Sequence, residues 1–171
     1  MAQSCTAEYS NYFGATSAAQ VNLVLAAFNT TYTRVNAVFE MDFNATMVLI
    51  ANTANVIYYN TATDPYSDAA NLANWNNELG ATLQSVIGNS NYDIGHLFGA
   101  TGGGGNAGCI GCVCSTDNSK GRGYTSPSNG IPEGDFFDID YVAHEIGHQL
   151  GGNHTFSHST ENNAVNMEPG S

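Results

Sequence analysis

Basic side chains are almost absent from this sequence. Only three of its 171 residues are Lys or Arg, against fifteen Asp and Glu, and the formal net charge is -12. Binding to nucleic acid rests on Lys and Arg that neutralise phosphates, and docking on an anionic membrane surface needs the same residues. The composition therefore argues strongly against both kinds of partner.

Long apolar runs are missing as well. The longest clear run covers residues 47–51, whereas a helix that crosses a bilayer needs roughly 18–20 apolar residues. The first residues, Met-Ala-Gln-Ser-Cys, contain neither the basic nor the apolar region of a signal peptide. We therefore expect no membrane insertion, and either a cytosolic protein or a domain cut from a longer secreted precursor.

What the chain does contain is enough for one globular domain. At 18.0 kDa and 42% hydrophobic residues it can bury a core, and it shows neither an internal repeat nor a domain boundary. With so few cations, ion-pair networks cannot hold the fold together, so burial of apolar surface has to do so.

Apolar residues three and four positions apart predict three helices. The first begins near Ser17, the second begins at Ser67 or Asp68 and ends at Gly88, and the third spans residues 138–150. Apolar or β-prone runs predict strands at 44–52, 56–59, 92–99 and 110–114. Residues 102–105, all glycine, are expected to be flexible, and 115–134 to be a long irregular connection. This alternation predicts a single α/β sheet domain.

Four cysteines leave their chemistry open. They are Cys5, Cys109, Cys112 and Cys114, and in an oxidising compartment they allow two disulfides in three pairings. The alternative is a metal-cluster or redox protein built on the Cys-x-x-Cys-x-Cys run, but such a cluster would normally need a second set of ligands.

The most informative stretch begins at His144. On a helix, His144 and His148 project from one face, and Glu145 lies beside that face. Gly151 can take the left-handed conformation that ends a helix, which turns the chain back so that His154 reaches the same point. Three neutral imidazoles and a water make an open tetrahedral zinc site, whereas Ca²⁺ and Mg²⁺ prefer oxygen ligands. A helix with two merely packed histidines would leave Gly151 and His154 unexplained.

The pattern HExxHxxGxxH over residues 144–154 resembles the zinc signature of the metzincins, and its surroundings resemble the reprolysin (adamalysin-like) branch, in particular secreted bacterial members. The resemblance implies a twisted, mostly parallel sheet with an antiparallel edge strand, flanked by helices that include the zinc-binding one. It also implies a secreted zinc endopeptidase that acts on extended peptides or proteins. Glu145 would be the general base for a metal-activated water.

Three further segments carry the resemblance. Residues 108–114 are similar to a family strand that ends in Cys, and 138–143 lead into the zinc helix as in family members. Residues 92–98 resemble the family's edge strand, along which substrate pairs. The substrate-binding residues implied are Asp93, Ile94, Gly95, His96, Leu97, Phe98 and Gly99.

Two of these residues have alternatives. Asp93 matches a structural calcium position of some reprolysins, or it is a solvated loop carboxylate. His96 either contacts substrate or is an ordinary packed or exposed histidine, and we favour the latter. His158 is expected to be a surface residue because three histidines already fill the zinc shell.

The sequence departs from the family pattern at its end. Metzincins have a methionine-containing turn beneath the zinc, and Met167 does not match it, because Glu-Pro-Gly-Ser precedes that turn in related bacterial enzymes. We therefore expect residues 1–171 to form a catalytic domain without the C-terminal lower subdomain, where the partner of Cys114 would lie.

The alternative function is a zinc-binding interaction module without activity, although such a module has no need of Glu145. Oligomeric state stays open.

Overall fold

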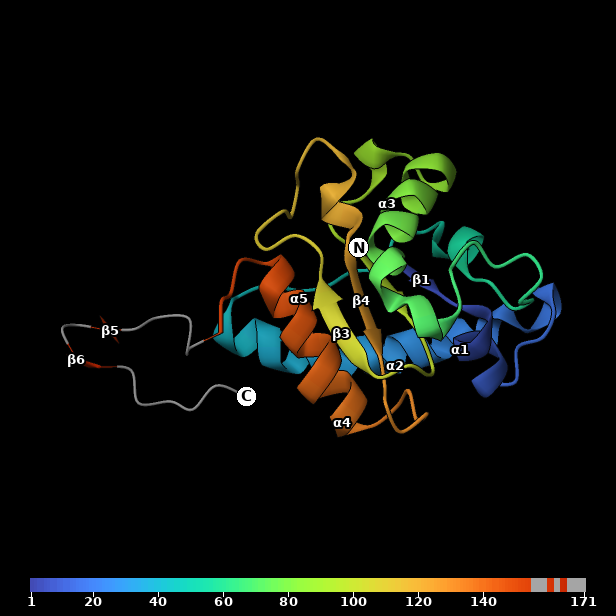
Figure 1. Ribbon diagram of the computed structural model, residues 1–171, viewed down its shortest axis with the longest axis horizontal. Coiled ribbons are helices and arrows are strands. Elements are labelled where there is room, and N and C mark those ends of the chain that lie inside the picture. Colours follow the sequence, from blue (N-terminus) through green and yellow to red (C-terminus); the bar gives the residue numbers. More distant parts are fainter. Residues whose placement is uncertain (155–159, 162–163, 166–171) are drawn as a thin grey trace.

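The computed structural model describes residues 1–154, 160–161 and 164–165. Its centre is a four-stranded sheet with the order β1-β2-β4-β3, in which β3 alone runs antiparallel to its neighbour. The strands are β1 Ala2–Cys5, β2 Gly95–Phe98, β3 Gly104–Ala107 and β4 Gly123–Ser126. Helices flank the sheet (Figure 1). The predicted fold class, a mostly parallel sheet with an antiparallel edge strand, is confirmed.

The alternation of side chains along β2 divides the core into two halves. Leu97 packs with Trp75, Leu79 and Leu83 of α3 (Trp75–Val86) on one face of the sheet. Phe98 packs on the other face against α2 (Val21–Asp42) and the C-terminal helical region. The sheet is thus buried on both faces, as is usual for parallel strands.

The first two predicted helices are present, with shifted starts. In α2 the buried residues include Val24, Phe28, Tyr32 and Val35, which are spaced by three and four as the periodicity requires, and a short 3-10 turn, Ala18–Gln20, precedes the helix. Before α3 lies a second 3-10 segment, Ala69–Asn74, whose N-cap is Asp68. The shorter helix α1, Ala7–Tyr12, follows β1 directly.

The third predicted helix is also present and has three parts. They are α4 Asp135–Phe137, a π-helical segment Asp138–Ala143, and α5 His144–Gln149. Gly151 has a φ of 111° and donates its N–H to the carbonyl of His148 at 2.9 Å, which ends α5 as predicted. π-Helical turns are rare and concentrate at functional sites, and this one directly precedes the first motif histidine.

Two of the predicted strands near the N-terminal half are wrong. Residues 44–52 form no strand, although the Ile50 N–H donates to the Met1 carbonyl and the Met1 amino group donates to the Val48 carbonyl. Residues 53–56 form a 3-10 turn, and of the predicted strand 56–59 only a bridge between Ile57 and Cys5 is formed. The apolar run 47–50 is not a buried strand: Val48 is 68% exposed, and β1 pairs with β2.

The glycine-rich half of the chain was misassigned more seriously. Residues 110–114 form turns around a disulfide rather than a strand. The edge strand β3 begins inside the tract expected to be flexible, and β4, an inner strand, lies within the expected irregular connection 115–134. Both strands are rich in small residues, so they carry little of the apolar signal on which strand prediction relies.

The cysteines form one disulfide, between Cys109 and Cys112. Cys5 is a buried free thiol, and Cys114 is an exposed one. A cluster that uses all three neighbouring cysteines is therefore not formed.

A short antiparallel pair, β5 Thr160–Glu161 and β6 Ala164–Val165, completes the described elements. No helix in the described ranges has the length and hydropathy that a membrane span requires.

Candidate metal centre

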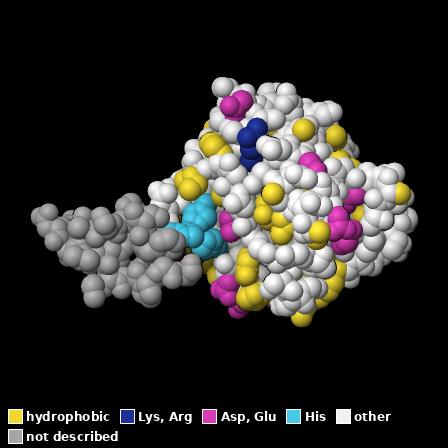
Figure 2. All heavy atoms as spheres, in the orientation of Figure 1, with side chains coloured by type: hydrophobic (Ala, Val, Ile, Leu, Met, Phe, Trp, Pro, Cys, Tyr) yellow, Lys and Arg dark blue, Asp and Glu magenta, His cyan; other side chains and the backbone are white. Residues whose placement is uncertain are grey.

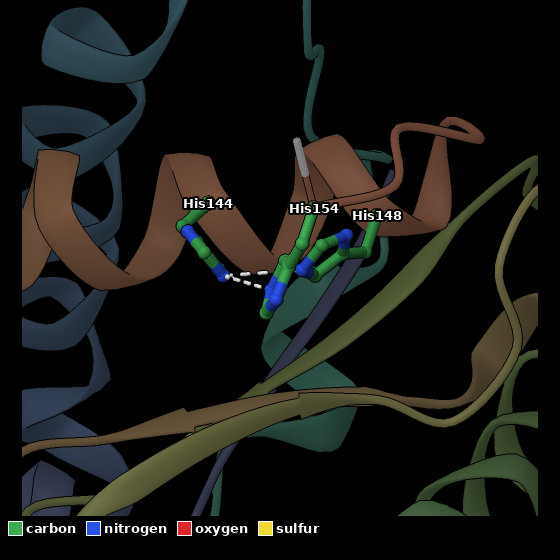
Figure 3. Close-up of side chains that lie close together, drawn as sticks. All are labelled: His144, His148 and His154. Carbon is green, nitrogen blue, oxygen red and sulfur yellow. Dashed lines mark hydrogen bonds between the residues drawn. The ribbon is translucent and has the colours of Figure 1, made fainter. Parts of the chain in front are cut away.

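Three histidine side chains converge beside α5 (Figure 3). His144 and His148 extend from one face of α5, and His154 returns to them on the segment after Gly151. The Nε2 atom of His144 lies 3.1 Å from that of His148 and 3.2 Å from that of His154. Figure 2 shows these imidazoles gathered at the surface. The predicted ligand set is thus brought together.

The spacing of these nitrogens suits a tetrahedral zinc ion. Zn–N bonds of about 2.0–2.1 Å place tetrahedral nitrogen ligands about 3.3–3.4 Å apart, close to the distances found. In the described part of the chain, this triad is the one group of three His, Cys, Asp or Glu residues able to share a metal ion. Nitrogen donors favour zinc over calcium or magnesium.

The surroundings of the triad prepare it for metal ligation. The Nδ1–H of His148 donates to the carbonyl of Gly152 at 2.6 Å, which leaves its Nε2 as the acceptor that points to the other two rings. Burial, and then the neighbouring charges of His148 and His154, lower the pKa of His144. A lowered pKa favours the neutral imidazole, the form that binds a metal ion.

Glu145 lies beside the triad and is only 7% exposed. Burial raises the pKa of its carboxyl group, while the charge of His148 and a hydrogen bond from the Ala107 N–H act in the opposite direction. A carboxylate in such a setting binds protons more readily than one in water, which suits proton transfer.

Strand β3 lies directly against Glu145. A Cβ atom on Gly105 would be 2.5 Å from the Glu145 Cγ and Oε1 atoms, a distance at which one of the two residues would have to move. Gly105 therefore permits the close approach of β3 to the carboxylate. The glycine tract 102–105 was expected to be flexible, although such a tract can equally indicate a close approach of the backbone.

A hollow of about 310 Å³ lies between β3 and the triad. Its lining joins the three histidines and Glu145 to residues 105–107 of β3, and to Ile110 and Asn153. The region has the layout of a cleft in which an extended chain could lie beside the metal ligands.

His96 anchors this region instead of contacting a ligand. The ring is fully buried, its Nδ1–H donates to Gln149 Oε1 at 2.7 Å, and its Nε2 lies 2.9 Å from Thr125 Oγ1. Gln149 in turn donates from Nε2 to the Gly95 carbonyl at 2.8 Å. Burial lowers the pKa of His96 to about 4, so the ring is neutral and ties α5 to β2 and β4.

The edge position predicted for residues 92–98 is wrong, whereas contact of these residues with substrate stays a prediction. Strand β2 lies between β1 and β4, so it offers no free edge, and its four residues are buried. The carbonyls of Asp93 and Ile94 accept hydrogen bonds from Cys114 and Ala2, and the Gly99 N–H donates to the Thr125 carbonyl. The residues predicted to bind substrate were Asp93, Ile94, Gly95, His96, Leu97, Phe98 and Gly99. The strand at the edge of the sheet next to the histidine triad is β3.

Two other predictions gain no support. Asp93 lies outside the histidine group, and within the described ranges it belongs to no other set of three metal-binding residues, so the calcium site stays a prediction. His158 and Met167 fall outside the described residues.

Comparison with known families agrees with this geometry. The comparison with curated proteins gives no match. A family model described as metallo-peptidase family M12B, reprolysin-like, matches residues 1–171, and it thus spans the triad, Glu145 and the sheet above them. The chain therefore belongs to the reprolysin-like M12B metallopeptidase family.

Proposed function

We propose that this chain is a zinc-dependent endopeptidase in which His144, His148 and His154 hold the metal ion and Glu145 is the general base. The observation that carries the proposal is the position of Glu145: a buried carboxylate directly between the imidazole triad and the edge strand. A module that only binds zinc has no need for a buried acid at this point, because burial of a carboxylate is costly.

The chemistry follows from the residues around the cleft. His144, His148 and His154 would hold a zinc ion, which would supply a Lewis acid able to activate a water and polarise a carbonyl. The Glu145 carboxylate accepts the proton of the attacking water and passes it to the amine that leaves. The Ala107 N–H holds this carboxylate in place through its hydrogen bond.

Substrate is proposed to lie along β3 in place of the predicted segment. The Gly108 N–H donates to the Arg122 carbonyl, so in the antiparallel pair the bonds to β4 come from alternate residues of β3. Gly105 and Ala107 consequently direct their backbone groups away from β4, and there the Ala107 N–H bonds to Glu145. An extended peptide can add to this edge as a further strand.

An extracellular location is part of the same proposal. The Cys109–Cys112 disulfide supports it, because structural disulfides form and persist mainly in oxidising compartments. The scarcity of Lys and Arg leaves peptides or proteins, rather than nucleic acid, as the substrate class.

The deciding experiment separates metal binding from catalysis. Glu145→Gln keeps the ligands and removes the base, so we expect full zinc content and a loss of peptide hydrolysis by at least about a thousandfold. His148→Ala should lose both zinc and activity. The matched control is Glu40→Gln, the same change at an exposed position of α2. Zinc is measured by metal analysis and hydrolysis with a quenched fluorescent protein substrate.

Each outcome has one meaning. Activity of Glu145→Gln within tenfold of the parent would show that Glu145 is not the base. A parent that binds zinc but cleaves nothing would favour the alternative, an interaction module without catalytic activity. An unchanged zinc content in His148→Ala would show that His148 is not a zinc ligand.

A further inference from the structure

The loop between β3 and β4 holds one apolar side chain at the cleft. Ile110 is 52% exposed and lines the same hollow as the three histidines and Glu145. Single exposed apolar side chains are common on proteins and by themselves indicate nothing. Ile110 differs from such side chains because the loop that carries it is closed by a disulfide and bonded to the carbonyl of His148.

Three constraints hold this loop. Its ends are held by hydrogen bonds from the Gly108 N–H to Arg122 and from the Cys114 N–H to Asp93, at 2.9 and 2.8 Å. Between them, the Cys109–Cys112 disulfide closes a short ring around Ile110 and Gly111.

The ring also touches the helix that carries the ligands. The Gly111 N–H donates to the carbonyl of His148 at 3.2 Å, and a Cβ on Gly111 would lie 3.6 Å from the Gly151 Cα. Gly111 has a φ of 72°, the left-handed conformation that favours glycine. Figure 1 shows the loop beyond β3 lying beside α5. Ile110 therefore lies on a disulfide-closed ring that is hydrogen-bonded, through the Gly111 N–H, to the backbone carbonyl of His148.

We propose that Ile110 and its disulfide ring form a specificity wall that selects a large apolar side chain of the substrate. This inference rests on the proposed peptidase function. An apolar substrate side chain that covers Ile110 removes apolar surface of both partners from water, whereas a polar one loses hydration without a hydrogen-bond partner there.

The direction of β3 indicates on which side of the scissile bond the substrate residue that faces Ile110 lies. A substrate that pairs antiparallel to β3 runs opposite to it, so its N-terminal part lies toward Ala107 and Ile110. The selected side chain therefore belongs to a residue on the N-terminal side of the bond that is cut.

A peptide library tests this directly. An equimolar synthetic library is digested with the parent and with Ile110→Ser, and the cut sites are mapped by mass spectrometry. The parent should favour Leu, Ile, Phe or Met at a position N-terminal to the cut. Ile110→Ser should reduce kcat/KM for those peptides about tenfold, mainly through KM, and leave Ser-containing peptides unchanged. Met41→Ser is the control, since Met41 is 86% exposed on α2 and lines no part of this cleft.

The disulfide is tested with the double variant Cys109→Ser, Cys112→Ser, which avoids reductants that also bind zinc. It should lose the apolar preference as Ile110→Ser does, while zinc content stays unchanged. An unchanged cleavage profile in Ile110→Ser, or a change confined to the C-terminal side of the cut, would overturn the proposal.

A binding measurement separates this inference from the proposed activity. Labelled Leu- and Ser-containing peptides are titrated against Glu145→Gln, with and without Ile110→Ser, and followed by fluorescence anisotropy. Tighter binding of the Leu peptide that disappears with Ile110→Ser supports the wall even if the parent cleaves nothing. Equal binding of both peptides to Glu145→Gln rejects the wall, whatever the outcome for hydrolysis.

Discussion

Strands β2 and β3 have the same length and opposite positions. All four residues of β2 are buried, and it bonds to β1 on one side and β4 on the other. Three residues of β3 are half-buried and one is exposed, and in the described sheet β3 pairs with β4 alone. Both strands use a glycine for a close approach: Gly95 meets Leu83 of the core, while Gly105 meets Glu145 of the cleft.

The comparison indicates that β2 stabilises the fold, whereas β3 borders the residues proposed to carry out the chemistry. In β2 the histidine, His96, is neutral and holds α5 against the sheet, so its substitution should affect stability first. In β3 the backbone borders the proposed base, so substitution there should affect activity first. Three predictions test this division, from the largest expected effect to the smallest.

The largest effect is the pH dependence of stability that His96 causes. The pKa of His96 is lowered from 6.5 to about 4, so between these values the unfolded chain binds a proton that the folded chain does not. The stability that the neutral ring provides is complete above pH 6.5 and is lost as the pH falls toward 4. The shift corresponds to about 3 kcal/mol.

Comparison with His96→Gln isolates this effect, because the other titrating groups are the same in both proteins. Urea unfolding at pH 7 and pH 4.5 should show that the destabilisation caused by His96→Gln shrinks by about 2–3 kcal/mol at the lower pH. The same destabilisation at both pH values would contradict a neutral, buried His96.

The second prediction concerns Gly105. In Gly105→Ala the new Cβ would overlap Glu145, so the carboxylate or β3 must shift. A displacement of about 1 Å at a catalytic group costs on the order of a hundredfold in rate. We expect about this loss in kcat, with zinc content retained.

Metal analysis and steady-state kinetics on Gly105→Ala check this outcome. A suitable control is Asn106→Ala on the next residue of β3, whose side chain bonds to Asn76 rather than to Glu145. If both variants lost activity equally, the effect would come from the strand as a whole and not from the contact with Glu145.

The smallest effect is the stability loss of Gly95→Ala. Its Cβ would lie 2.3 Å from Leu83 Cδ1 and 2.9 Å from the Gly121 Cα, inside a packed region. Overpacking of this kind typically costs about 1–3 kcal/mol. Thermal and urea unfolding should show this loss, while the folded fraction keeps a normal KM. A changed KM with unchanged stability would reverse the roles assigned to β2 and β3.

Much of the metal centre could be predicted from local spacing. His144 and His148 share a helix face because they are four residues apart, and Gly151 ends the helix because it tolerates positive φ. The pairing of strands could not be read in this way. Residues 92–98 were placed at the edge because a resemblance suggested it, yet the full burial of residues 95–98 is typical of an inner strand.

The spacing of residues along the chain determined the helices and the shared face of His144 and His148, because helical periodicity and turn chemistry act over a few neighbouring positions. The mostly parallel sheet was implied by the family resemblance. Tertiary structure alone decided that β3 is the edge strand, that Cys109 pairs with Cys112, and that Gly105 lies against Glu145. These contacts depend on how distant segments compete for the same hydrogen-bonding edges and buried volume. A glycine-rich segment carries almost no local signal of that outcome.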